Sequence, residues 1–165
     1  MIEELSKEYD IFMFDLDRTV FDTHTKKGEP IWAKQMIQPF LSQYFGEVVI
    51  DDCESQCELQ PGIRSVLKYL NSNGNKVGFI SRGGVFNLDY EKQPSIVLLK
   101  MFGIYDYFSF KKLMLYKTDV KANHLSEIGK CVFFDDMDKD LDAAKNVPDI
   151  VVIDRKEFKQ WDDLL

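Results

Sequence analysis

Three short apolar segments of the sequence each run directly into polar side chains that can take part in chemistry. The segments and the polar residues that follow them are 11–14 with Asp15 and Asp17, 76–80 with Ser81, and 131–134 with Asp135 and Asp136. Short apolar runs of this kind are typical of strands buried on both faces of a parallel sheet. Because the carboxyl ends of parallel strands lie at one edge of the sheet, we expect these side chains to meet there.

The four carboxylates in this set would repel one another strongly in a low dielectric unless a cation lay among them. Carboxylate oxygens suit Mg²⁺, which keeps several waters and bridges protein carboxylates to a substrate phosphate. The acidic residues therefore indicate phosphate chemistry. Acids at the end of a strand also cap the segment that follows, and Asp15 and Asp17 taken alone fit that role equally well.

Helical patterns alternate with the apolar segments. An apolar stripe predicts a helix from Pro61 to a stop at Asn73. Further elements are expected at 95–102 (helix), 105–110 (short strand or packed loop), 118–128 (helix capped by Thr118), 141–147 (helix), 150–153 (strand) and 156–165 (helix). This alternation predicts an α/β fold, a doubly wound, Rossmann-like three-layer sandwich around a mainly parallel sheet.

Residues 23–60 interrupt this alternation, and we interpret them as a small insertion after the first strand. Residues 23–30 are polar and predict a loop, and apolar residues every fourth position from Trp32 to Tyr44 predict a helix that Pro39 kinks or restarts. A short strand is expected at 48–50, whereas 51–60 has no regular pattern.

The composition favours one globular domain and excludes several classes of function. The chain has 165 residues with 45% hydrophobic content, and no apolar run approaches the length of a membrane span. A net charge of −7 argues against nucleic acid as a partner. The polar N-terminus resembles no signal peptide, so a cytoplasmic location is expected. Free thiols are favoured for Cys53, Cys57 and Cys131, because no second ligand pair supports a zinc site.

The motifs resemble those of the haloacid dehalogenase-like (HAD) superfamily of aspartate-nucleophile phosphatases. The run from Asp15 to Val20 matches the first motif, Ser81 the second, Lys117 the third, and Asp135-Asp136 with Asp140 the fourth. Within the superfamily, the residues around 80–82 and 133–136 are similar to the magnesium-dependent phosphatase-1 branch. The resemblance implies a single HAD-type catalytic domain over 1–165, with residues 23–60 as a small cap or flap.

The resemblance also implies a role for each acid. Asp15 would attack phosphorus and form an aspartyl-phosphate, and Asp17 would serve as general acid and base. Mg²⁺ would be held by the Asp15 side chain, the Asp17 backbone carbonyl and Asp136, with Asp135 and Asp140 in direct or indirect contact.

Ser81 and Lys117 would bind and stabilise the transferring phosphoryl group, and Arg82 could hold a substrate group beside it. Lys117 is preferred over Lys121 because it precedes the predicted helix. On residue type alone, Lys117 would be a solvated lysine and Arg82 a partner in a surface ion pair. Trp32, in the insertion, is a candidate substrate contact, although core packing or a solvated loop is preferred for it.

The resulting hypothesis is a Mg²⁺-dependent phosphatase acting on a phosphate monoester. The alternatives are a phosphomutase or phosphotransferase, a non-catalytic binding module on the same scaffold, and a signalling receiver domain, which the chain order of the acids disfavours. The insertion is too short for a large cap domain, which predicts an open site. An open site suits a phosphotyrosine or phosphoprotein substrate, although a sugar phosphate stays possible. The oligomeric state is left open.

Overall fold

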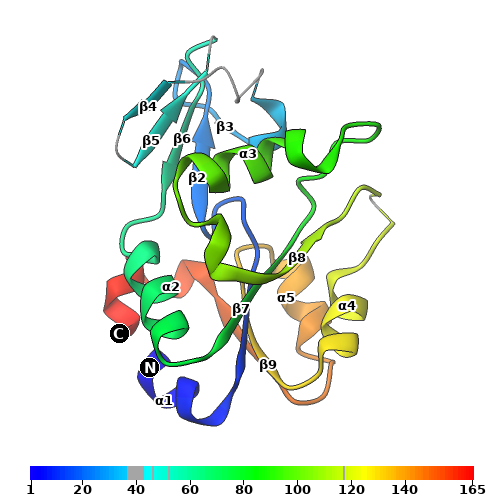
Figure 1. Ribbon diagram of the computed structural model, residues 1–165. Helices are drawn as coiled ribbons and strands as arrows, with labels where there is room; N and C mark the ends of the chain where they lie inside the picture. Colours follow the sequence, from blue (N-terminus) through cyan, green and yellow to red (C-terminus); the bar gives the residue numbers. More distant parts are fainter. Residues whose placement is uncertain (37–42, 46, 52, 117) are drawn as a thin grey trace.

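The computed structural model describes residues 1–165 except 37–42, 46, 52 and 117. A parallel sheet with strand order β10-β9-β1-β7-β8 forms the core (Figure 1). Its strands are β1 (Ile11–Phe14), β7 (Lys76–Ser81), β8 (Phe108–Leu113), β9 (Cys131–Asp135) and β10 (Ile150–Asp154). The predicted α/β class and parallel sheet are confirmed.

Helices cover both faces of this sheet, and β1 shows why its sequence is apolar throughout. The helices are α1 (Ile2–Glu8), α2 (Ile63–Ser72), α3 (Pro94–Met101), α4 (Lys121–Ile128) and α5 (Asp138–Ala144). Phe12 and Phe14 pack in one apolar cluster with α2, whereas Met13 packs in a second cluster with residues of α4 and α5. Successive side chains of a strand point to opposite faces, so a strand covered on both faces needs an unbroken apolar run.

Between β1 and α2 the chain builds a second, antiparallel sheet with strand order β3-β2-β6-β5-β4. Its strands are β2 (Phe21–His24), β3 (Pro30–Ile31), β4 (Gln43–Phe45), β5 (Val48–Ile50) and β6 (Gln56–Leu59). Figure 1 shows this sheet beyond one end of the parallel sheet, with α3 between the two. We call residues 21–59 the cap and this sheet the cap sheet.

The helix expected from Trp32 to Tyr44 is wrong wherever the chain is described. Ala33–Gln35 is a single 3₁₀ turn, and Tyr44 lies in β4, which pairs with β5 in an antiparallel hairpin. Phe40 and Pro39 lie outside the described residues. The hairpin satisfies the backbone of this segment with a partner strand, which a local apolar period cannot reveal.

Other boundaries also differ from expectation. Strand β2 begins before the predicted loop, and β6 occupies a stretch without a regular sequence pattern, where it pairs with both β2 and β5. Helix α4 begins at Lys121 with Val120 at its N-cap, so Thr118 does not cap it. The C-terminal segment forms 3₁₀ turns at Arg155–Glu157 and Trp161–Leu164 instead of one helix.

The structure also bears on the membrane and cysteine expectations. Within the described ranges, no helix combines the length and the apolar character needed to cross a membrane. Cys57 and Cys131 are buried, Cys53 is exposed, and all three are free.

Candidate active site

The polar ends of three core strands lie side by side. Strand β1 is in the middle, paired with β9 on one side and with β7 on the other. The pairing of β1 with β9 continues to the Asp15 N–H, which donates to the Phe134 carbonyl at 2.8 Å. Asp15, Asp135 and Ser81 are buried at the carboxyl ends of their strands. The structure therefore brings these side chains together at one edge of the sheet, as expected.

A buried lysine holds the acids of this edge together. Lys121 is only 2% exposed, and its Nζ donates to Asp15 Oδ1 at 2.6 Å and to Asp135 Oδ2 at 2.7 Å. The same Nζ lies 3.5 Å from Asp140 Oδ2. Lys121 was the second choice from sequence, and the preferred Lys117 lies outside the described residues. The first residue of α4 thus brings the positive charge to the nucleophile candidate.

Burial dominates the electrostatics of this edge. It raises the pKa of Asp15 to about 6 although Lys121 opposes the shift, and it raises the pKa of Asp135 to about 7 with a further contribution from the charge of Asp15. Burial also raises the pKa of Asp136 to about 6. Burial alone would lower the pKa of Lys121, but the charges of Asp15 and Asp135 outweigh it and raise the pKa above its usual value. The site thus concentrates more negative charge than one lysine neutralises.

Asp17 occupies a different environment from Asp15. Its Oδ1 accepts the backbone N–H of Ala33 at 2.7 Å, so the cap contacts this side chain directly. Burial raises the pKa of Asp17 to about 6, and the Ala33 hydrogen bond opposes that shift. The next residue, Arg18, turns with a φ of 64° and places its guanidinium 4.3 Å from the ring centroid of Trp32.

Ser81 begins a tight loop after β7. Its Oγ accepts the N–H of Gly83 at 3.2 Å, and a Cβ on Gly83 would lie 2.5 Å from Ser95 Oγ. Glycine therefore lets this loop pass close to α3. Arg82 donates to Asp140 Oδ2 at 2.7 Å and to the Asp119 carbonyl at 3.3 Å, so it is paired within the site.

Three carboxylates could hold a cation. One oxygen from each of Asp15, Asp135 and Asp136 lies within 4.8 Å of the others. Asp136 Oδ1 is buried and has no hydrogen-bond partner among the described residues. Both oxygens of Asp135 already accept hydrogen bonds, from Lys121 and from the Met137 N–H. The oxygen ligands and the unpartnered Asp136 atom fit Mg²⁺, with Asp15 and Asp136 as the better direct ligands. The Asp17 side chain is outside this group.

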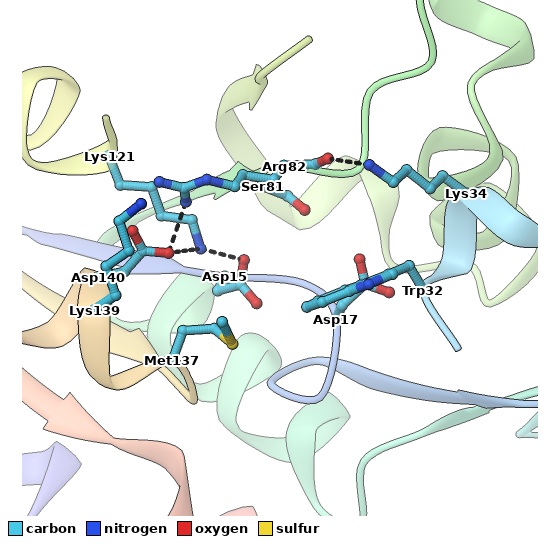
Figure 2. Close-up of a pocket in the computed structure, with 10 residues that line it drawn as sticks. All are labelled: Asp15, Asp17, Trp32, Lys34, Ser81, Arg82, Lys121, Met137, Lys139 and Asp140. Atoms are coloured by element: carbon cyan, nitrogen blue, oxygen red, sulfur yellow. Dashed lines mark hydrogen bonds and ion pairs between the residues drawn. The ribbon is translucent and has the colours of Figure 1, made fainter. Parts of the chain in front are cut away.

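The acids open into a cavity of about 260 Å³. Figure 2 shows its walls: Lys121, Asp140, Lys139 and Met137 on one side, with Trp32 and Lys34 of the cap on the other. The insertion thus forms one wall of the site, although it is too short for a large cap domain. The reason is that the insertion folds as a sheet and lays the turn at 33–35 against Asp17.

Sequence reasoning missed several residues of this cavity. For Trp32, packing or a solvated loop was preferred over a substrate contact, and Lys34, Met137 and Lys139 were not considered, yet all four line the cavity. Met137 and Lys139 follow the Asp135-Asp136 pair so closely that their position could have suggested them. No local signal marks Trp32 or Lys34, because the folding of the cap places them.

Comparisons with known proteins agree with this architecture. No family model matches the sequence, and no curated protein shows significant sequence similarity to it. Among solved structures, a candidate phosphatase from Clostridium difficile superposes with a TM-score of 0.53 at 15% identity, covering 95% of this chain and 99% of that one. A hydrolase of the haloacid dehalogenase-like family from Streptococcus pneumoniae gives a TM-score of 0.51 at 12% identity, over 92% and 97% of the two chains.

These similarities identify the class of fold. The chain has the haloacid dehalogenase-like fold, a parallel α/β core with an insertion after the first strand. The resemblance inferred from the four motifs is therefore confirmed at the level of the fold. The magnesium-dependent phosphatase-1 branch stays a prediction.

Proposed function

We propose that this protein is a Mg²⁺-dependent phosphatase that hydrolyses phosphate monoesters through an aspartyl-phosphate on Asp15. The observation that carries the proposal is the buried Lys121 between Asp15 and Asp135, 2.6 Å and 2.7 Å from their oxygens, beside the unpartnered oxygen of Asp136. A buried, crowded set of acids at the open edge of a sheet costs stability, and such arrangements concentrate at functional sites.

In the first step, Asp15 acts as the nucleophile. Lys121 holds Oδ1, and the other carboxylate oxygen attacks phosphorus, forming an Asp15 acyl phosphate as the bond from phosphorus to the leaving oxygen breaks. The Ser81 hydroxyl would donate to the phosphoryl oxygens, since Ser81 lies at the end of the neighbouring strand β7.

Asp17 moves the proton in both steps. In its protonated form it gives a proton to the leaving oxygen, and as a carboxylate it then takes one from the water that attacks the acyl phosphate, releasing inorganic phosphate and free Asp15. A pKa raised to about 6 suits a group that must change protonation state near neutral pH. The Ala33 N–H fixes one carboxyl oxygen and leaves the other for the transfer.

Asp15 and Asp136 would hold the Mg²⁺, together with the Asp17 backbone carbonyl that the family resemblance implies, and Asp135 would support them. When bound, the ion would offset the repulsion between the Asp15 carboxylate and a phosphate dianion. In its absence, Lys121 supplies the positive charge closest to Asp15 in the described chain.

The test is phosphate release from p-nitrophenyl phosphate, with Mg²⁺ or with a chelator, by wild type and Asp15→Asn. We expect Mg²⁺-dependent turnover with one phosphate released per p-nitrophenol, and a loss of at least about 10³-fold in Asp15→Asn because the nucleophile is gone. The exposed Asp106→Asn is the matched control and should behave like wild type. Wild-type turnover in Asp15→Asn would contradict the mechanism. Release of p-nitrophenol without free phosphate would indicate a phosphotransferase.

A further inference from the structure

Two lysines of the cavity wall have no carboxylate to neutralise them. Lys34 and Lys139 both line the cavity and are exposed, and neither forms an ion pair with an acid of the described residues. The contact of Lys34 with the core is a hydrogen bond from its Nζ to the Arg82 carbonyl at 3.5 Å. Both amines are therefore available to a ligand.

The other basic side chains of the cavity are already paired with carboxylates. Lys121 is shared between Asp15 and Asp135, and Arg82 is paired with Asp140. The cavity wall carries four basic side chains against three carboxylates, although the whole chain has a net charge of −7. Of these four basic side chains, Lys34 and Lys139 are the two that pair with no acid of the described residues.

Lys34 stands where a leaving group would extend. The phosphoryl group must lie at Asp15, between Ser81 and Lys121, whereas Figure 2 shows Lys34 entering from the cap on the opposite wall, next to Trp32. The Arg18 guanidinium, 4.3 Å from the ring centroid, braces the Trp32 ring. A leaving group that extends from phosphorus would therefore pass Trp32 and reach the amine of Lys34.

We propose that Lys34 selects phosphate monoesters whose leaving group carries a second anionic group, such as a carboxylate. This inference rests on the proposed phosphatase function and deepens it. We take the substrate to be a small, doubly anionic ester, because its size suits a cavity of about 260 Å³ with the cap as one wall. A Lys–carboxylate hydrogen bond is charge-assisted and strong enough to bias binding between otherwise identical esters.

The experiment compares three aryl esters that differ only in the second anionic group: phenyl phosphate, meta-carboxyphenyl phosphate and para-carboxyphenyl phosphate. For wild type we expect kcat/KM to be about 10-fold higher for the better carboxyphenyl isomer than for phenyl phosphate. The two isomers should differ from each other, because a direct contact depends on where the carboxylate sits whereas long-range attraction depends on charge alone.

Lys34→Gln tests the residue. It should lower kcat/KM for the better carboxyphenyl ester about 5- to 10-fold more than for phenyl phosphate. Lys27→Gln is the matched control, because Lys27 is an exposed cap lysine outside the cavity and its loss changes the net charge equally. Equal losses on all three esters in Lys34→Gln would mean general attraction and would overturn the proposal, as would a wild type that treats the esters alike.

A binding measurement separates this inference from the proposed function. The chain has two tryptophans, and Trp161 is fully buried, so fluorescence changes on ligand addition report chiefly on Trp32. Titrating Asp15→Asn with each ester should give about 10-fold tighter binding of the better carboxyphenyl ester, regardless of leaving-group reactivity. If no ester is hydrolysed by wild type, the phosphatase proposal fails, while this titration still decides whether the cavity prefers a second anion. Equal affinities for phenyl phosphate and the carboxyphenyl esters would contradict the inference even if the protein is an active phosphatase.

Discussion

The three central strands of the parallel sheet, β9, β1 and β7, are buried almost throughout, whereas β2 and β6 of the cap sheet alternate between buried and more exposed side chains. Every residue of β9 is buried, but β2 and β6 bury only every second residue. Burial in the core raises the pKa values of Asp15 and Asp135 at its edge. The cap presents partly solvated side chains to the same cavity, among them Lys34 and Trp32. We therefore assign chemistry to the core and substrate selection to the cap.

Among the substitutions that distinguish the core from the cap, the largest expected effect is a loss of kcat on changing a core lysine. Lys121→Met should lower kcat about 10²- to 10³-fold, because it removes the buried charge that pairs with Asp15. Steady-state kinetics on p-nitrophenyl phosphate measure this, with circular dichroism to check folding. Lys117→Met should stay close to wild type. The opposite pattern, with Lys117 essential and Lys121 dispensable, would show that Lys117 is the lysine of the third motif.

The next effect concerns stability. Phe14→Ala should lower the free energy of unfolding by about 3–5 kcal/mol, because the ring is fully buried and stacks on Phe134 with 4.9 Å between centroids. Val49 of the cap is also fully buried, and Val49→Ala should lower the free energy of unfolding by only about 2 kcal/mol. Urea unfolding of both variants checks the difference. Equal losses would mean that the cap is as strongly coupled to global stability as the core.

The acid cluster should make stability depend on pH and on Mg²⁺. Burial in the folded protein raises the pKa of Asp136 from its usual 3.8 to about 6, so folding favours the protonated carboxyl. The stability that this group contributes is therefore full below about pH 4 and is lost as the pH rises to about 6. Without Mg²⁺, Asp136→Asn should therefore melt a few degrees higher than wild type at pH 7. It should also lose the increase in Tm that Mg²⁺ gives wild type. Thermal melts at pH 4 and pH 7, with and without Mg²⁺, measure both effects, and an unchanged Mg²⁺ response would contradict the assignment of Asp136.

The smallest effect tests the contact between cap and core. Ala33→Pro removes the N–H that donates to Asp17, at a position that begins a helical turn and tolerates proline. Because this hydrogen bond lowers the pKa of Asp17, its loss should raise the pKa and move the alkaline limb of the kcat profile to higher pH by less than about one unit. A pH–rate profile against wild type measures the shift. A shift to lower pH would mean that Asp17 is not the acid.

Much of the core could be predicted from sequence because its signals are local. The runs 12–14, 77–80 and 131–134 are apolar without alternation, and the structure buries them on both faces. Polar residues directly after such strands mark the edge where a site forms, so Asp15, Ser81 and Asp135 followed from position alone. Helix α2 carried both an apolar stripe and a glycine stop, and its extent matches the prediction.

The cap could not be predicted in the same way. Its strands are two to four residues long, and their partners lie elsewhere in the chain, so β6 showed no regular pattern and Tyr44 lay within a predicted helix. Short strands gain their stability from pairing, which is a tertiary property.

The sequence by itself therefore determined the α/β class, the edge of the sheet where the acids gather and the identity of those acids, because each depends on a residue and its immediate neighbours. Only the tertiary structure decided which lysine neutralises Asp15, since Lys121 lies 106 positions away from it. The same holds for the contact of Ala33 with Asp17 and for the lysines and tryptophan that line the cavity. Such contacts depend on how distant segments pack, and no local pattern in the sequence encodes that packing.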